Sequence, residues 1–187
     1  MPELYLFGGP NGAGKTTIAL EILPILGCNQ FLNADAIARA LSPFDVDTVA
    51  FQAGVLMMKR LRRIAQNGED FASESTLAAR AWVPFIKECK ARGYRFNLIY
   101  VWLPSAEMAI ERVKARVLSG GHDIPEATIR RRYEAGRKNF VELYAPLADR
   151  WIAFDNSGEQ RKIIAAKEKG NDKIQIMEAA TWQQILG

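Results

Sequence analysis

Short apolar runs alternate with stretches of helical periodicity along this chain of 187 residues. Apolar or β-branched runs bounded by turn residues are typical of buried strands. They predict strands at residues 3–8, 29–32, 70–74, 94–103 and 151–155. Apolar residues spaced three and four apart predict helices at residues 17–26, 36–41, 47–67, 79–91, 105–118 and 126–144.

Strands that alternate with helices predict an α/β fold, in which a mostly parallel central sheet is flanked by helices. The chain ends differently, because residues 162–167 and 173–177 flank Gly170-Asn171, which is typical of a β-hairpin. A final helix is expected from Thr181. No repeat or linker is visible, so residues 1–187 are expected to form a single domain, with the hairpin and helix at about 159–187.

One motif between the first strand and the first helix carries specific chemistry. Its residues match G-x-x-x-x-G-K-[ST]: Gly9, Pro10, Asn11, Gly12, Ala13, Gly14, Lys15 and Thr16, followed by Thr17. Glycines let successive N–H groups curl around phosphate oxygens, and the helix dipole adds positive potential. Lys15 is expected to reach the β- and γ-phosphates, and the Thr16 hydroxyl to bind Mg²⁺. A chance glycine-rich turn is the alternative, but the flanking strand and helix argue against it. The pattern of P-loop NTPases and kinases therefore predicts a nucleoside triphosphate site.

Ligands of open parallel sheets bind at the carboxyl ends of the strands, which directs attention to the residues there. Asp35 is a candidate catalytic base or indirect Mg²⁺ ligand, and a helix N-cap is its structural alternative. Glu74 ends a buried strand beside the phosphate loop, which favours a functional role. Thr76 is a candidate substrate contact, with capping as its alternative. Asp155-Asn156 follows the strand at 151–155.

Arginines gather on the two helices that flank a glycine-rich segment at residues 119–125. Arg112 and Arg116 lie four apart on one helix face. On the next helix, Arg132 lies on one side of the apolar stripe, and Arg130 and Arg137 on the other. Guanidinium groups around a hinge predict a lid at about 112–137 that closes over a triphosphate. A basic surface or an RNA-binding face is the alternative.

His122 is the single histidine and lies in this hinge, so it is either a surface residue or a substrate contact. The net charge of +4 fits anionic substrates and nucleic acid equally well. The longest apolar run is far below the roughly 20 residues of a membrane span. Two distant cysteines and no signal peptide predict a cytoplasmic protein with free thiols and no membrane association.

Taken together, the motifs resemble the zeta toxin family over about residues 3–157. The resemblance is carried by Gly9 to Thr17, Asn33-Ala34-Asp35, Glu74-Ser75-Thr76, Ile110-Glu111-Arg112, Gly121 to Pro125 and Ile129 to Tyr133. It implies a kinase that uses ATP and Mg²⁺ to phosphorylate a hydroxyl of a UDP-sugar such as UDP-N-acetylglucosamine. It also implies a small antitoxin partner.

The resemblance assigns roles to individual residues. Lys15 and Thr16 would bind phosphate and metal, and Asp35 would deprotonate the acceptor hydroxyl. Glu74 would place the substrate, and Arg112 would stabilise the transferring phosphoryl group. His122 stands where larger members have a second lid arginine, so either Arg116 or an arginine of 130–132 replaces it or phosphoryl transfer is weakened.

Three other functions compete with this reading. A nucleoside, nucleotide or metabolite kinase would share the same chemistry. A nucleic-acid-associated ATPase would use the arginine-rich helices on a phosphate backbone. These helices carry no aromatic platform, which argues against nucleic acid as a partner. A regulatory nucleotide switch would hydrolyse slowly and have no acceptor.

Overall fold

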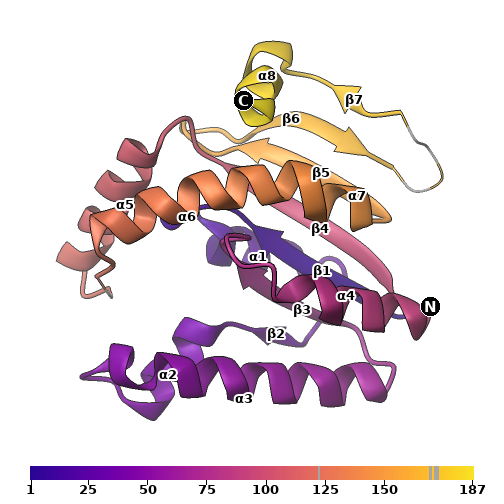
Figure 1. Ribbon diagram of the computed structural model, residues 1–187, viewed down its shortest axis with the longest axis horizontal. Helices are drawn as coiled ribbons and strands as arrows, with labels where there is room; N and C mark the ends of the chain where they lie inside the picture. The colour runs from indigo at the N-terminus through magenta and orange to yellow at the C-terminus, as the bar shows by residue number, and fades with distance from the viewer. Residues whose placement is uncertain (122, 169, 171–172) are drawn as a thin grey trace.

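The structure is a computed structural model that describes residues 1–121, 123–168, 170 and 173–187. Its centre is a seven-stranded sheet in the order β2-β3-β1-β4-β5-β6-β7 (Figure 1). The strands are β1 Glu3–Gly8, β2 Phe31–Leu32, β3 Phe71–Ser75, β4 Arg95–Trp102, β5 Arg150–Asp155, β6 Lys162–Lys167 and β7 Gln175–Ile176. The helices are α1 Lys15–Ile22, α2 Ala34–Leu41, α3 Val46–Gln66, α4 Trp82–Ala91, α5 Ala106–Leu118, α6 Glu126–Asn139, the π-helix η1 Phe140–Tyr144, α7 Ala145–Leu147 and α8 Ala179–Leu186.

The strands β1 to β5 pair in parallel, and β6 and β7 add two antiparallel strands at one edge. β1 lies between β3 and β4, so Gly8 at its end is level with Ser75 and Tyr100. This arrangement confirms the predicted α/β class, the mostly parallel sheet and the C-terminal hairpin followed by a helix. It also brings the loops after β1 and β3 to the same edge.

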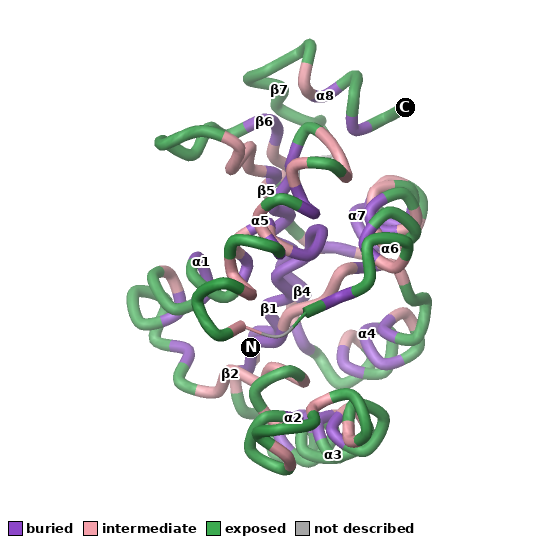
Figure 2. The backbone as a smooth tube through the Cα atoms, turned by 90° about the vertical axis from the view of Figure 1, so that its left-hand side faces the viewer, coloured by how far each residue is buried: buried purple, intermediate pink, exposed green. Residues whose placement is uncertain are grey.

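Helices cover both faces of the sheet, because alternate residues of the buried strands point to opposite sides. In β1, Leu4 and Leu6 pack into a core with α3, α4, η1 and α8, whereas Tyr5 and Phe7 pack into a second core with α1 and α5. Figure 2 shows the strands between these two layers. α6 contributes to the second core at its start and leads into the first through η1.

Several element boundaries differ from the predicted ones. α1 begins two residues earlier than expected, at Lys15, and ends at Ile22, ahead of Pro24. The predicted continuous helix to Tyr144 is α-helical only to Asn139, and the π-turn that follows buries both Phe140 and Tyr144. Phe140 stacks on Tyr100 with ring centroids 4.0 Å apart, a contact that the sequence pattern does not reveal. In the part of the chain that the structure describes, no helix combines the length and apolarity needed to cross a membrane.

Candidate active site

The phosphate loop connects β1 to α1 through a backbone that requires glycine. Gly9 has φ +144°, and an added Cβ would lie 2.2 Å from the carbonyl oxygen of Val101 on β4. Gly14 has φ +88° and directly precedes α1, in the left-handed region that favours glycine. The first N–H groups of α1 have no intrahelical partner, so the loop and helix present amides at the carboxyl edge of the sheet.

Lys15 is buried at the start of α1, with a relative exposure of 8%. Its Nζ donates a hydrogen bond to the Pro10 carbonyl oxygen at 2.9 Å. Burial lowers the pKa of Lys15, while the nearby carboxylates of Glu74 and Asp35 act to raise it. Arg116 and Arg132 add to the lowering. The predicted lysine, carboxylates and two of the predicted arginines therefore share one electrostatic environment.

Glu74 lies beside Thr16 at the end of β3. The Thr16 hydroxyl donates to Glu74 Oε2 at 2.7 Å, and the Asn33 side-chain amide donates to Glu74 Oε1 at 3.0 Å. β3 is adjacent to β1, which places this carboxylate next to the phosphate loop. A hydroxyl and a carboxylate are oxygen donors of the kind that Mg²⁺ prefers.

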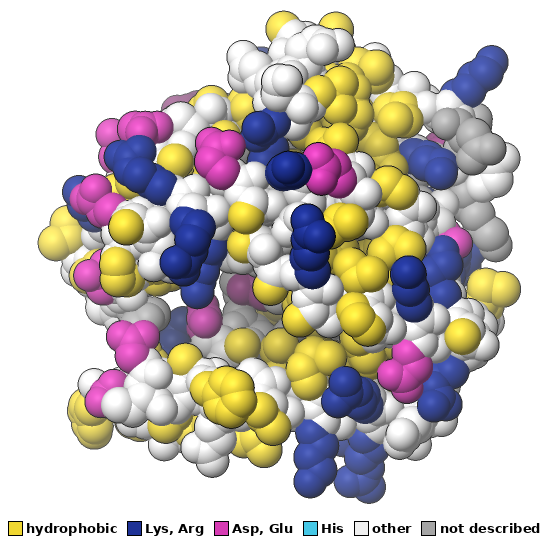
Figure 3. All heavy atoms as spheres, in the orientation of Figure 1, with side chains coloured by type: hydrophobic (Ala, Val, Ile, Leu, Met, Phe, Trp, Pro, Cys, Tyr) yellow, Lys and Arg dark blue, Asp and Glu magenta, His cyan; other side chains and the backbone are white. Residues whose placement is uncertain are grey.

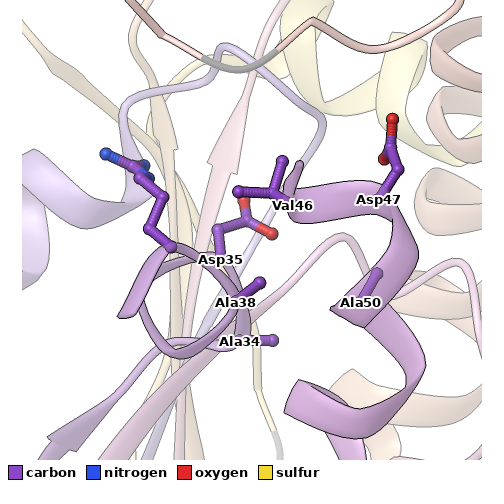
Figure 4. A pocket seen from close by; sticks show the side chains of 7 residues that line it. Ala34, Asp35, Ala38, Val46, Asp47 and Ala50 are labelled. Atoms are coloured by element: carbon purple, nitrogen blue, oxygen red, sulfur yellow. The ribbon is translucent and has the colours of Figure 1, made fainter. Parts of the chain in front are cut away.

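Asp35 is exposed in the first turn of α2, near the phosphate loop. The capping alternative for Asp35 is wrong, because the N-cap of α2 is Asn33, whose Oδ1 accepts from the N–H groups of Asp35 and Ala36. Asn and Asp are equally good N-caps, so residue type alone could not choose between the two positions. Asp35 lines a small pocket between α2 and α3, together with Asp47 and the alanines Ala34, Ala38 and Ala50 (Figure 4).

The arginines of the predicted lid divide into two groups. Arg112 Nη2 donates to the Ser157 carbonyl oxygen at 3.1 Å, and its Cβ lies against the phosphate loop at Gly12. Arg116 and Arg132 are partly buried and act on Lys15, as described above. Arg130 instead pairs with Glu107, and Arg137 binds the Ile185 carbonyl oxygen on α8.

Substrate contact is also predicted for Thr76 and His122. The Thr76 carbonyl oxygen packs against Gly136 of α6, and its role in substrate contact stays a prediction. His122 lies outside the described residues.

Figure 3 shows a hollow between the part of the molecule that carries α5 and α6 and the part that carries α2 and α3, with acidic and basic side chains on its walls.

Sequence reasoning did not assign a contact role to two asparagines of the site. Asn33 caps α2 and binds Glu74, and Asn156 binds the phosphate loop by donating to the Ala13 carbonyl oxygen at 2.8 Å. The capping role of Asn33 could have been predicted from its position directly before a helix. No local sequence pattern indicates that Asn156 contacts the phosphate loop.

The parallel sheet, the glycine-rich loop and the buried lysine define a P-loop nucleotide-binding protein with a kinase-like α/β fold. The chain belongs to the AAA domain family, whose model matches residues 4–140. This match supports a P-loop kinase-like domain and does not confirm the zeta toxin family in particular.

A sequence relative and two solved structures show what this chain is similar to. An uncharacterized protein of Haemophilus influenzae is 29% identical over 137 residues, which cover 70% of this chain and 92% of that protein. The AvrRxo1-ORF1:ORF2 complex with ATP superposes with a TM-score of 0.81 at 19% identity, over 99% of this chain. This chain spans only 63% of that protein's length. A structure of the PezAT toxin-antitoxin system of Streptococcus pneumoniae has a TM-score of 0.63 at 18% identity, over 89% of this chain and 72% of that one. Both structural likenesses concern the fold.

Proposed function

We propose that this protein is an ATP-dependent phosphotransferase that transfers the γ-phosphate of ATP to a hydroxyl of a small molecule. One observation carries the proposal: hydrogen bonds tie two carboxylates from different segments to the phosphate loop. Glu74 accepts from Thr16 of the loop, and Asn33, which donates to Glu74, caps the helix that carries Asp35. A nucleotide-binding switch has no need of a second, solvent-accessible carboxylate across the loop. An alcohol acceptor does, because its proton must leave as the new P–O bond forms.

Each residue has a proposed role in this reaction. The loop amides and Lys15 bind the phosphates, and Arg112, Arg116 and Arg132 offset the negative charge of the transferring group. Asp35 accepts the proton of the acceptor hydroxyl while ADP leaves. Phosphoryl transfer depends mainly on positioning and charge stabilisation, and this set of groups supplies both.

Magnesium fits the donor set as a cation shared between protein and nucleotide. The described residues contain no cluster of three or more His, Cys, Asp or Glu side chains that could hold a metal alone. Mg²⁺ is usually bound through one or two protein groups plus phosphates and water. Thr16 Oγ1 and Glu74 would hold it, and the ion would neutralise phosphate charge. This role for Glu74 replaces substrate placement in our proposal, because one of its oxygens accepts from the Thr16 hydroxyl and the other from Asn33.

The acceptor is proposed from the resemblance to zeta toxins, with UDP-N-acetylglucosamine as the first compound to test. A nucleoside, nucleotide or other metabolite is the alternative within the same chemistry. Binding along a nucleic-acid backbone is disfavoured, because Arg130 and Arg137 of α6 are engaged with Glu107 and α8.

A small antitoxin-like protein is a proposed partner, since PezAT is a toxin-antitoxin system. Growth arrest on expression, relieved by a neighbouring gene product, would test that role.

The catalytic proposal is tested by following phosphate from γ-labelled ATP to a panel of UDP-sugars, nucleosides and nucleoside monophosphates. Lys15→Ala should abolish transfer by removing the phosphate-binding ammonium. Asp35→Asn should leave ATP binding intact in calorimetry and reduce kcat by about 100-fold or more, the usual scale for a general base.

Asp45→Asn provides a matched control for Asp35→Asn. Asp45 caps the neighbouring helix α3 by accepting from the Thr48 N–H, and Asn caps equally well. The control should therefore transfer phosphate at the wild-type rate. A wild-type protein that transfers phosphate to no alcohol, or an Asp35→Asn variant with unchanged kcat, would contradict the proposal.

A further inference from the structure

The loop after β5 contacts the phosphate loop from the side opposite Glu74. Asn156 lies at its start, and its side-chain amide donates to the Ala13 carbonyl oxygen at 2.8 Å across 143 positions of sequence. A Cβ added to Gly14 would lie 2.7 Å from the same Asn156 nitrogen. The amide of Asn156 is therefore packed directly against the Ala13–Gly14 peptide.

Asn156 is itself held by the end of the sheet. Its backbone N–H donates to the Trp102 carbonyl oxygen of β4 at 3.2 Å. The Ser157 N–H donates to Asp155 Oδ1 at 2.8 Å, which closes the turn, and the Ser157 carbonyl oxygen accepts from Arg112. The side chain that reaches the phosphate loop thus extends from a braced segment.

The hydrogen bond has a consequence for the direction of a backbone donor. A trans peptide is planar, so its C=O and N–H point in opposite directions. Holding the Ala13 carbonyl toward Asn156 turns the Gly14 N–H away from Asn156. In a phosphate-binding nest, such N–H groups must point at the phosphate oxygens. Gly14 at φ +88° is conformationally free enough to lose this orientation without a partner.

We propose that Asn156 is a positioning residue that orients the Ala13–Gly14 peptide so that its N–H binds a phosphate of the nucleotide. The inference rests on the proposed function, because it assumes a bound triphosphate. Asn156 touches the loop backbone in this role and acts on the nucleotide through it. The same turn also holds Arg112, so one segment supports both the phosphate loop and a lid arginine.

The proposal is tested by calorimetric binding of ATP, ADP, AMP and adenosine to the full chain and to Asn156→Ala. Losing one oriented donor should weaken ATP and ADP binding by about tenfold, while adenosine binding stays unchanged. Asn156→Asp, which keeps the shape but replaces the donor with a repelling carboxylate, should weaken them further. Thermal unfolding of each variant shows that the chain is folded. If Asn156→Ala does not fold, the near-isosteric Asn156→Asp carries the test.

Asn67→Asp serves as the matched control, because Asn67 lies at the end of α3 and binds Glu69. It should bind all four compounds like the wild type. Asn156 variants with wild-type ATP affinity, or with equal losses for ATP and adenosine, would overturn the positioning role while leaving the kinase proposal intact. A wild-type protein that binds no nucleotide would overturn both.

Discussion

Asn33 connects the two carboxylates of the site through the two ends of one amide. Its oxygen caps α2, the helix that carries Asp35, and its nitrogen binds Glu74, which in turn accepts from Thr16. The helix that carries Asp35, the proposed base, and the proposed magnesium ligands are therefore held in one hydrogen-bonded chain. Outer groups of this kind set the orientation of the groups that touch ligands.

Replacing Asn33 separates its two functions. Asn33→Ser keeps a capping oxygen but loses the donor to Glu74, and Asn33→Asp also places a second carboxylate beside Glu74. Both variants should retain a melting temperature close to that of the wild type. Both should lose about 10- to 100-fold in phosphotransfer, with a changed Mg²⁺ dependence, and Asn33→Asp should lose more. Wild-type rates and Mg²⁺ titrations in both variants would show that Asn33 is a cap alone.

The structure places α6 close to the segment that follows β3, and a glycine makes this approach possible. A Cβ added to Gly136 would lie 2.3 Å from the carbonyl oxygen of Thr76. Asn139, one turn further on, donates to the carbonyl oxygens of Leu77 and Ala78. Because Arg132 lies on the same helix, this contact also sets how the arginine is placed relative to the site.

Two helical glycines allow a paired test of this packing. Gly136→Ala should destabilise the protein by about 1–3 kcal/mol, since the methyl group collides with backbone and α6 must shift. Gly54→Ala, in α3 with nothing within 4 Å of the added Cβ, should instead stabilise it by about 0.5–1 kcal/mol. Denaturant unfolding measures both changes. Shifts of the same sign in the two variants would contradict the close contact.

The helical periodicity of α6 predicted part of this arrangement. It separated Arg132 from Arg130 and Arg137 across the apolar stripe. In the structure the charge of Arg132 acts to lower the pKa of Lys15, whereas Arg130 pairs with Glu107 and Arg137 binds α8. Periodicity could not say which side faces the site, because that depends on where the helix docks. The π-turn at η1 was not predicted either, and no local pattern in the sequence marks it. Its Phe140 stacks on Tyr100 of β4, a contact between distant parts of the chain.

At the scale of the whole molecule, the sequence predicted the elements and the edge where they meet, but not their order. The phosphate loop and α1 follow from neighbouring residues. In contrast, the hydrogen bond between Thr16 and Glu74 joins residues 58 positions apart in the sequence, and that between Asn156 and Ala13 joins residues 143 positions apart. Such contacts depend on which strands pair, and parallel pairing leaves no turn signal in the sequence. Hence the sequence singled out the loop and Glu74 beside it, but not the contact of Asn156 with Ala13.

A cluster of charged side chains joins three strands at their amino-terminal ends, opposite the end that carries the phosphate loop. Glu3 of β1 accepts hydrogen bonds from Arg95 and Asn97 of β4, and Arg150 of β5 pairs with it at 4.0 Å. Burial acts to raise the pKa of Glu3, but the hydrogen bonds from Arg95 and Asn97 and the positive charges outweigh it and leave the pKa below its ordinary value. This end of the sheet lies away from the phosphate loop, so the cluster serves the fold.

The lowered pKa of Glu3 predicts how stability responds to acid. A carboxyl whose folded pKa lies below its unfolded value stabilises the protein above the unfolded pKa, and this contribution is lost as the pH falls through the folded pKa. Glu3→Gln should therefore cost about 1–3 kcal/mol at pH 7, and its deficit should shrink as the pH drops below about 4.5. Glu126→Gln, which removes a solvent-exposed pair with Lys114, is the control and should change stability little at any pH. Urea unfolding of the three proteins between pH 7 and pH 3 measures the difference. A Glu3→Gln deficit that stays constant across this range would mean that packing, and not the charge of Glu3, joins β1 to β4 and β5.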